Sequence, residues 1–250
     1  MPAYNEAANL PHVFARMPAG VFEVVLVDGG SSDDTIAVAR ELWPGIRVIK
    51  QEGRGKGNAL ICGFEAARGD IIVMLDADGS ADPQEIHQFV AVLSAGADFA
   101  KGSRFLPGGG SADITPIRRL GNRALGGSVN LLFGTRYTDL CYGYNAFWRT
   151  HLVDIAADCD GFEIETLINI RIAQSRINVV EVPSFEYSRI HGQSNLSAVR
   201  DGWRILRTIA RERLRRRRHT APALAPVVPH TAPVSLRSAE PVAAIDEAGL

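Results

Sequence analysis

The chain has 250 residues, of which 46% are hydrophobic and 22% charged, and its formal net charge at pH 7 is -1. This length suits one α/β domain, alone or with an appendage, and the composition is ordinary for a globular protein. A net charge so close to zero gives the whole molecule no attraction to polyanions, so nucleic acid is excluded as an expected partner.

The three cysteines and the hydropathy pattern predict a cytoplasmic protein. Cys62, Cys141 and Cys159 are widely spaced, odd in number and form no CxxC pair, so neither a disulfide framework nor a zinc site is expected. No apolar run approaches the roughly 20 residues that a membrane-spanning helix needs, and no signal peptide opens the chain. Any membrane contact is therefore expected to be peripheral, at the inner face of the cell membrane.

The first hundred residues alternate between short apolar runs and amphipathic stretches. The apolar runs predict strands at residues 22–27, 46–49, 71–75 and 99–101. The amphipathic stretches predict helices at residues 34–42, 57–68 and 83–93, the last with Asp82 as N-cap and Pro83 in its first turn. Strands that alternate with helices predict an α/β domain whose mostly parallel sheet carries helices on both faces.

The second half of the chain has a looser pattern. A glycine run at 108–110 indicates a loop, and the remaining pattern predicts helices at 117–133, 163–175 and 197–214 and strands at 144–148 and 178–182. In the last helix, Val199, Trp203, Leu206 and Ala210 share one face. This apolar face predicts that Trp203 belongs to the core.

The two ends of the chain differ from the rest. The chain opens at Pro2 with no apolar strand in front, so the first strand of the sheet is expected to be missing or truncated. The expected catalytic domain covers residues 1–210, followed by a basic helix end at 211–218. Residues 219–250 hold five prolines, eight alanines and no aromatic residue. Such a segment buries too little apolar surface to offset its chain entropy, which predicts a disordered tail.

A pair of carboxylates provides the first chemical signal. Asp76-Ala77-Asp78 directly follows the apolar run 71–75, and ligands of open α/β sheets bind beyond the carboxyl ends of the strands. Two carboxylates there can hold a hard divalent cation through oxygen ligands. A capped turn with two solvated aspartates is the alternative.

Two more polar segments stand at element junctions. Asp28 opens the segment DGGSSDDT after the predicted strand 22–27, where its carboxylate can accept hydrogen bonds from a base or ribose. Lys56 lies in a glycine-flanked turn before a predicted helix, a position that suits a phosphate. An ordinary turn explains either segment equally well. The absence of GxGxxG disfavours a dinucleotide-dependent oxidoreductase.

In order and spacing, these segments resemble the family 2 glycosyltransferases with the GT-A fold. The matching segments are PAYNE at 2–6, DGGSSDDT at 28–35, GKGNA at 55–59 and DADGS at 76–80. Later segments resemble the dolichyl-phosphate or polyprenyl-phosphate mannosyltransferase branch: GSRF at 102–105, DL at 139–140, GFEIE at 161–165, EVP at 181–183 and GQSNL at 192–196. The resemblance covers residues 2 to about 210 and implies a GT-A nucleotide-sugar binding domain.

The resemblance implies roles for individual residues on the donor side. The residues that match donor-binding positions are Pro2, Tyr4, Glu6, Asp28, Lys56 and Asp76. Among them, Asp28 would contact the base. Asp76 and Asp78 would bind Mg²⁺ or Mn²⁺ together with the donor diphosphate.

The acceptor side is implied by the second half of the chain. The residues that match or lie near phosphate-facing positions are Arg104, Arg118, Arg189 and Ser194. Glu165 stands where the family keeps a carboxylate in the acceptor region, and with Asp78 it is a candidate catalytic residue.

The implied reaction is the inverting transfer of a hexosyl group from a GDP- or UDP-hexose, with a polyprenyl (lipid) phosphate as the expected acceptor. Three alternatives stay open. Asn195 stands where the lipid-phosphate branch usually has lysine, so a hydroxyl acceptor is one of them. A nucleotidyltransferase would also use a metal-binding carboxylate on an α/β sheet. An inactive nucleotide-sugar binding module is the third.

Overall fold

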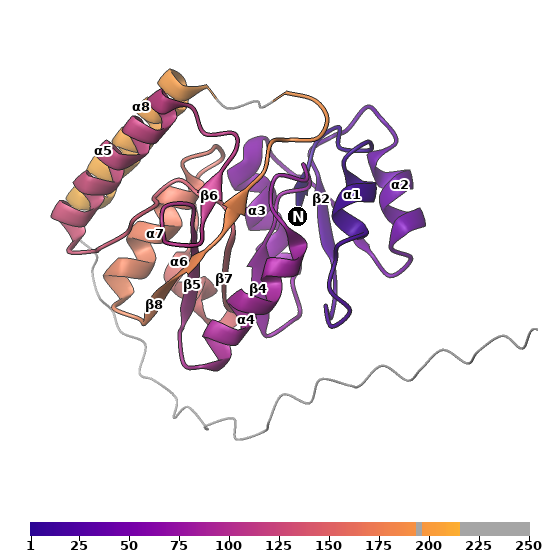
Figure 1. The fold of residues 1–250 in the computed structure, drawn as a ribbon, viewed down its shortest axis with the longest axis horizontal. Coiled ribbons are helices and arrows are strands. Elements are labelled where there is room, and N and C mark those ends of the chain that lie inside the picture. The colour runs from indigo at the N-terminus through magenta and orange to yellow at the C-terminus, as the bar shows by residue number, and fades with distance from the viewer. Residues whose placement is uncertain (194–196, 216–250) are drawn as a thin grey trace, which may run out of the picture. The chain divides into compact units, whose positions relative to one another are not determined.

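The N-terminal part of the chain forms a three-stranded parallel sheet in the computed structural model, which describes residues 1–193 and 197–215 (Figure 1). The strand order is β1 (Pro2–Ala3), β2 (Val25–Asp28) and β3 (Arg47–Lys50). The helices α1 (Leu10–Phe14) and α2 (Thr35–Leu42) connect these strands. The first strand, expected to be missing or truncated, is present as two residues, since the Val27 N–H donates to the Met1 carbonyl at 2.8 Å.

A four-stranded mixed sheet forms the centre of the domain. Its order is β4 (Ile71–Met74), β7 (Asn145–Trp148), β5 (Phe99–Ser103) and β8 (Val179–Pro183). Strand β7 runs antiparallel to both of its neighbours, whereas β5 and β8 are parallel. The α/β class predicted from the sequence is confirmed, with β7 as the antiparallel exception.

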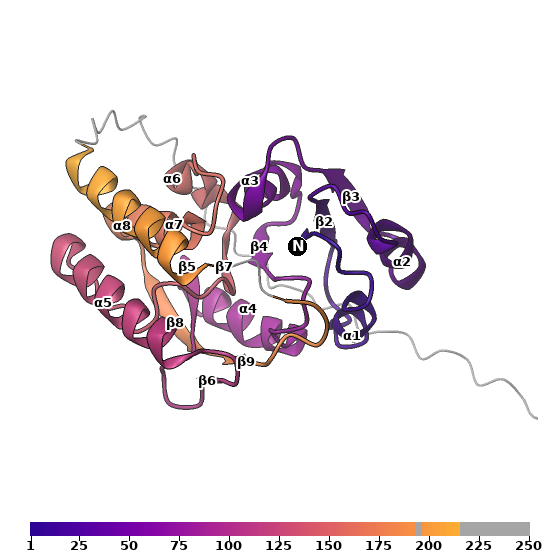
Figure 2. The same cartoon turned by 90° about the horizontal axis from the view of Figure 1, so that it is seen from above.

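Helices cover both faces of this sheet, as predicted (Figure 2). On one face, α3 (Gly55–Ala66), α6 (Leu152–Ile155) and α7 (Ile164–Ser175) pack against β4, β7 and β5 through Leu60, Phe147 and Leu167. On the other face lies α4 (Ile86–Ser94), preceded by the 3-10 turn η1 (Pro83–Glu85). The predicted N-cap is confirmed, because the Asp82 carboxylate accepts from the Gln84 N–H at 3.0 Å.

Two long helices lie side by side beyond α7: α5 (Pro116–Phe133) and α8 (Ala198–Leu214) (Figures 1 and 2). Val129 of α5 and Ile205 and Ile209 of α8 bury their side chains against Ile170 of α7. Before α5 and α8, the short strands β6 (Gly110–Ser111) and β9 (Phe185–Glu186) pair in parallel, where the glycine run predicts only a loop.

The face of α8 that the sequence predicts to be buried is exposed. Trp203 is 69% exposed, and Leu206 is exposed as well, whereas Asp201, Ile205 and Glu212 are buried. The prediction that Trp203 belongs to the core is therefore wrong. The buried acidic side chain of Glu212 is compensated by Arg171 of α7, whose Nη2 lies 3.1 Å from Oε1. No helix within the described ranges is long and apolar enough to cross a membrane.

Candidate functional site

A cavity of about 1010 Å³ opens beyond the ends of β1 and β4, beside the first turn of α3. It extends to α5 and α8. Most of the residues that the sequence predicts for the site line this cavity: Pro2, Tyr4, Glu6, Lys56, Asp76, Asp78, Arg104, Arg118, Glu165 and Arg189. The fold thus brings donor-side and acceptor-side candidates together in a single space. Ser194 lies outside the described residues.

Asp28 is the predicted donor residue that does not line the cavity. Its buried carboxylate accepts hydrogen bonds from the N–H groups of Gly30 at 3.1 Å and Ser31 at 3.2 Å. These bonds close the turn that follows β2. A contact between Asp28 and the base stays a prediction, and in this structure the carboxylate shapes the loop.

Lys56 forms ion pairs with two carboxylates in the cavity. Its Nζ lies 2.7 Å from Oδ2 of Asp76 and 2.8 Å from Oε1 of Glu165. Burial alone would lower the pKa of Lys56, but the two carboxylates raise it, so this ammonium stays charged. Burial also raises the pKa of Glu165, against the attraction of Lys56.

The position of Lys56 depends on a close backbone approach. Lys56 lies in the first turn of α3, and the next residue, Gly57, donates its N–H to the Asp160 carbonyl at 2.8 Å. A Cβ atom on Gly57 would come within 2.3 Å of the Cys159 carbonyl oxygen. Only glycine permits this contact, which places the start of α3 against the loop before α7 and so brings Lys56 beside Glu165.

Arg189 bridges the second pair of carboxylates. Its Nη2 lies 3.1 Å from Oδ2 of Asp78, and its Nη1 lies 3.0 Å from Oε1 of Glu6. Burial raises the pKa of Glu6, while a hydrogen bond from Asn9 at 2.6 Å opposes this shift. The Asn9 side chain also bonds both the N–H (2.9 Å) and the carbonyl (3.2 Å) of His191, which anchors the segment that carries Arg189.

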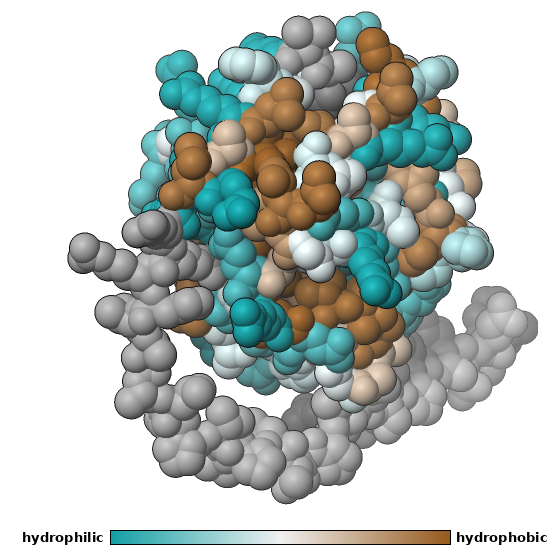
Figure 3. Space-filling view, turned by 90° about the vertical axis from the view of Figure 1, so that its left-hand side faces the viewer, coloured by the Kyte–Doolittle hydropathy of each residue, from teal (hydrophilic) through white to brown (hydrophobic). Residues whose placement is uncertain are grey.

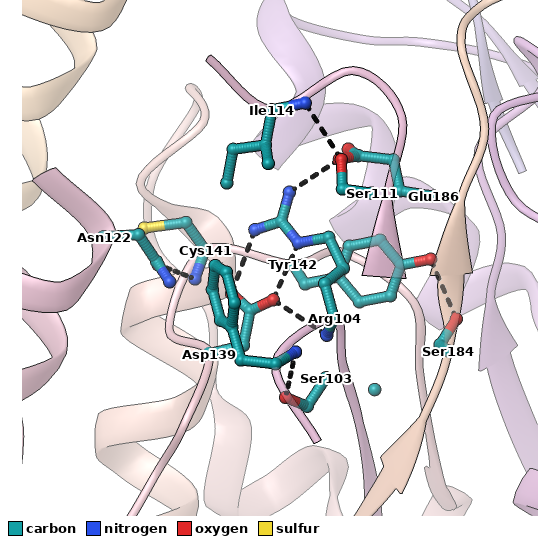
Figure 4. A network of polar contacts seen from close by, with 12 residues as sticks. Ser103, Arg104, Ser111, Ile114, Asn122, Asp139, Cys141, Tyr142, Ser184 and Glu186 are labelled. Atoms are coloured by element: carbon teal, nitrogen blue, oxygen red, sulfur yellow. Dashed lines mark hydrogen bonds and ion pairs between the residues drawn. The ribbon is translucent and has the colours of Figure 1, made fainter. Parts of the chain in front are cut away.

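Arg104 is held in a buried polar network at the cavity wall (Figure 4). Its Nε lies 2.7 Å from Oδ2 of Asp139, its Nη2 lies 2.9 Å from Oδ1, and its Nη1 lies 3.0 Å from Glu186. The guanidinium also stacks over the Tyr142 ring at 4.8 Å. All three nitrogens already donate, so this geometry favours a structural role over the predicted phosphate contact. Its partners Asp139 and Glu186 are not predicted from the sequence.

Arg118 is less constrained than Arg104. It lies in the first turn of α5, where Thr115 caps the helix, and its Nη1 lies 2.8 Å from Oδ2 of Asp113. The Arg118 side chain is 25% exposed and that of Asp113 is 43% exposed. This ion pair is open to solvent and exchangeable, so Arg118 can turn to a phosphate in the cavity.

The carboxylates of Asp76 and Asp78 fit a hard divalent cation. Each lines the cavity, and each is matched by one basic side chain, Lys56 or Arg189. Within the described part of the chain, no three His, Cys, Asp or Glu side chains gather around one point. A site with two protein carboxylates suits Mg²⁺ or Mn²⁺ bound jointly with phosphate oxygens and water.

Comparison with known proteins identifies the family. The family model "Glycosyl transferase family 2" matches residues 1–162. Glycosyltransferase AglJ of Haloferax volcanii is 33% identical over 207 residues, covering 80% of this chain and 66% of that protein. The polyprenol monophosphomannose synthase of Mycolicibacterium smegmatis is 35% identical over 214 residues, covering 79% of both chains. The dolichol-phosphate mannosyltransferase of Pyrococcus furiosus is 32% identical over 206 residues, covering 78% of this chain and 58% of that one.

Solved structures share the fold. Glucosyl-3-phosphoglycerate synthase from Mycobacterium tuberculosis, in complex with Mn²⁺, UDP-glucose and glycerol 3-phosphate, superposes with a TM-score of 0.67 at 23% identity. The match covers 84% of this chain and 77% of that one. This likeness confirms the predicted GT-A fold. Because the family model covers more than half of its residues, the chain belongs to glycosyl transferase family 2.

Proposed function

We propose that this glycosyltransferase moves a hexosyl group, with inversion, from a GDP- or UDP-hexose to a polyprenyl phosphate. The observation that carries the proposal is the cavity in which the carboxylate pair Asp76 and Asp78 faces the basic side chains of Lys56 and Arg189. The names of the relatives from Mycolicibacterium smegmatis and Pyrococcus furiosus support a lipid-phosphate acceptor.

On the donor side, Asp76 and Asp78 would hold Mg²⁺ or Mn²⁺, which when bound stabilises negative charge on the leaving diphosphate. The chain itself adds a fixed positive charge there. Lys56 is buried between its carboxylates and is therefore already oriented. It would orient the donor before the reaction, so little reorganisation accompanies charge development. Arg189 is the candidate for the acceptor, because its planar guanidinium suits bidentate contact with the oxygens of a phosphate.

On the acceptor side, the chemistry of a phosphate differs from that of a hydroxyl. A phosphate monoester is already ionised near pH 7, because its second pKa lies near about 6. It needs basic side chains that position it for attack on the anomeric carbon, opposite the leaving diphosphate. A sugar hydroxyl instead needs a carboxylate base within hydrogen-bond reach. Since Glu165 is buried and ion-paired with Lys56, its geometry supports positioning of that lysine over proton abstraction.

Two variants distinguish the acceptor classes. With polyprenyl phosphate as acceptor, we expect Arg189→Ala to lower transfer by roughly two decades or more, and Glu165→Gln to retain a substantial rate. The assay measures both variants with polyprenyl phosphate and with a free-hydroxyl sugar. Arg40→Ala, an exposed arginine on α2, is the matched control. An inactive Glu165→Gln enzyme that melts like the wild type, beside an active Arg189→Ala enzyme, would favour a hydroxyl acceptor and overturn the proposal.

Product analysis tests the remaining alternatives. A nucleotidyltransferase would release pyrophosphate and a nucleotide-sugar, whereas a glycosyltransferase releases the nucleoside diphosphate. An inactive module would bind nucleotide and never consume the donor. A thermal-shift screen of UDP- and GDP-sugars with and without Mn²⁺ identifies the base, because a ligand that binds only the folded state raises the melting temperature. A lipid acceptor also requires that the enzyme meet a membrane, so peripheral membrane contact is part of the proposal.

A further inference from the structure

Helices α5 and α8 each expose an apolar stripe at helical spacing. On α5, Ile117 and Leu120 are each 68% exposed and Leu131 is 85% exposed. On α8, Trp203 is 69% exposed and Leu214 is 82% exposed. Positions three, seven and eleven residues apart share one side of a helix, so these side chains form two stripes. Because the helices lie side by side, the two stripes lie on the same side of the molecule, where Figure 3 shows brown apolar patches between teal hydrophilic residues.

The same surface carries more positive than negative charge. Exposed arginines accompany the apolar side chains of both helices: Arg119, Arg123, Arg204, Arg207, Arg211 and Arg213. Helix α5 contains no acidic residue, and the two acidic residues of α8, Asp201 and Glu212, are each only 1% exposed. Two of these arginines are already ion-paired: Arg204 with Asp201, and Arg211 with Glu212 and the exposed Asp158. The exposed face of the helix pair is therefore apolar and basic.

The positive charge of this surface favours an anionic partner over a second copy of the chain. A second copy of the chain would bring arginines against arginines, and such like-charge contact costs affinity. An anionic bilayer satisfies both features, because its headgroups attract arginine and its acyl boundary accepts leucine, isoleucine and tryptophan. The long arginine side chains can keep their charges at headgroup level while their aliphatic stems extend over the apolar surface.

The helix pair also forms one wall of the site cavity. Ile117, Gly121 and Leu125 of α5 and Gly202 and Ile205 of α8 line it. We propose that the exposed faces of α5 and α8, called here the docking face, bind an anionic lipid bilayer and seat the cavity next to it. A lipid phosphate then reaches the cavity while its apolar chain stays in the bilayer. This last step rests on the proposed lipid-phosphate acceptor, whereas the docking itself does not.

Vesicle binding of the full chain tests the docking face. Cosedimentation is measured with phosphatidylcholine vesicles that contain either no phosphatidylglycerol or 30% phosphatidylglycerol as a roughly typical anionic load. The double variant Leu131→Ser with Trp203→Ser removes apolar contact. Its matched control is Phe22→Ser with Val153→Ser, which changes two side chains of comparable exposure away from the docking face. All four residues lie outside the cavity lining, so the fold and the site are left intact.

We expect the wild type and the control to bind the anionic vesicles, and the docking-face variant to bind at least about tenfold more weakly, since each side chain lost from an apolar boundary is worth about that factor. Arg119→Gln with Arg207→Gln should weaken binding chiefly at low salt, in contrast to Arg40→Gln with Arg68→Gln. Circular dichroism confirms that each variant is folded.

Three outcomes would overturn the inference: no binding by the wild type, unchanged binding by a folded docking-face variant, or a dimer of the wild type that the same substitutions dissociate. A separate arm measures transfer to polyprenyl phosphate in vesicles and in detergent. A docking-face variant that loses transfer only in vesicles supports the inference. If the enzyme binds vesicles through this face but never uses a lipid phosphate, the docking stands and the proposed acceptor fails.

Discussion

At the scale of single residues, the cavity balances each of its metal-binding candidates with one cation. Asp76 is paired with Lys56, and Asp78 with Arg189. Lys56 is the more buried of the two cations and is shared with Glu165, whereas Arg189 is shared with Glu6. Asp76 and Asp78 therefore have different ion-pair partners, so substitutions of the two residues can be tested separately.

Replacing Asp78 by asparagine tests the metal role. The change removes one of two carboxylate charges, and we expect transfer to fall by roughly two to three decades, the usual effect of losing one charge-stabilising group. The Mn²⁺-dependent gain in nucleotide affinity, measured by calorimetry, should disappear as well. The melting temperature should stay close to that of the wild type, because Asp78 lies at the cavity and not in the core. Turnover near the wild-type rate would refute the metal role of Asp78.

A double-mutant cycle tests how Glu6 acts. The resemblance assigns Glu6 to the nucleotide pocket, but the structure pairs it with Arg189 at 3.0 Å. If Glu6 works by holding Arg189, Glu6→Gln should lower kcat/KM by about tenfold in the wild type and have little further effect in Arg189→Ala. Independent effects that multiply would instead indicate a direct contact between Glu6 and the nucleotide. Nucleotide affinity measured without acceptor provides a second readout.

The sequence predicts which residues line the cavity better than it predicts which ion pairs they form. Short motifs such as DAD fix which side chains follow a strand, and strand ends converge at one edge of a sheet, so Asp76 and Asp78 could be placed in advance. The partners of Arg104 could not, because Asp139 and Glu186 lie 35 and 82 positions away in the chain. The local sequence does not indicate such pairs, because only the packing of the fold brings their residues together.

At the scale of elements, the spacing of apolar residues predicts the helix α8 correctly but not which of its faces is buried. Trp203, Leu206 and Ala210 do share a face of α8, but that face is exposed. Periodicity identifies a stripe and cannot tell a core from a docking surface, since both are apolar. The direction of β7 could not be predicted either, because the sequence of a four-residue strand does not show whether it pairs in parallel or antiparallel.

The buried pair of Arg104 and Asp139 ties the end of β5 to the loop before β7 and gives a stability prediction. Asp139→Ala leaves a buried guanidinium without its bidentate partner, so we expect the free energy of unfolding to fall by about 3–5 kcal/mol. Urea denaturation followed by circular dichroism measures the change. Asp113→Ala, which breaks the exposed pair with Arg118, is the control and should cost no more than about 1 kcal/mol.

The same pair predicts that its contribution to the free energy of unfolding is lost at acidic pH. Burial alone would raise the pKa of Asp139, but the hydrogen bonds from Arg104 hold it below its ordinary value of 3.8. A carboxylate whose pKa is lower in the folded state stabilises the fold above its unfolded pKa, and the contribution is lost as pH falls through the folded value. The destabilisation caused by Asp139→Ala should therefore be full at neutral pH and shrink below about pH 4.

At the scale of the whole molecule, the described core is complete without the proline-rich segment. The four buried apolar clusters are built from residues between Ala3 and Ile209. Deleting residues 219–250, which lie outside the described residues, should leave the melting temperature and donor hydrolysis unchanged within error. A clear drop in the melting temperature would show that this segment contributes to stability.

The strand order of the central sheet has a consequence for how the protein is made. Strand β4 pairs with β7, and Met74 lies opposite Asn145, about 70 positions later in the chain. At ribosomal rates of about 5–20 residues per second, β4 waits on the order of 4 to 14 seconds before its partner is synthesised. During that interval its apolar run IIVM is a nascent segment without this neighbour. The enzyme should therefore depend on chaperones that hold emerging chains, and slowing translation between residues 75 and 145 should lower its soluble yield.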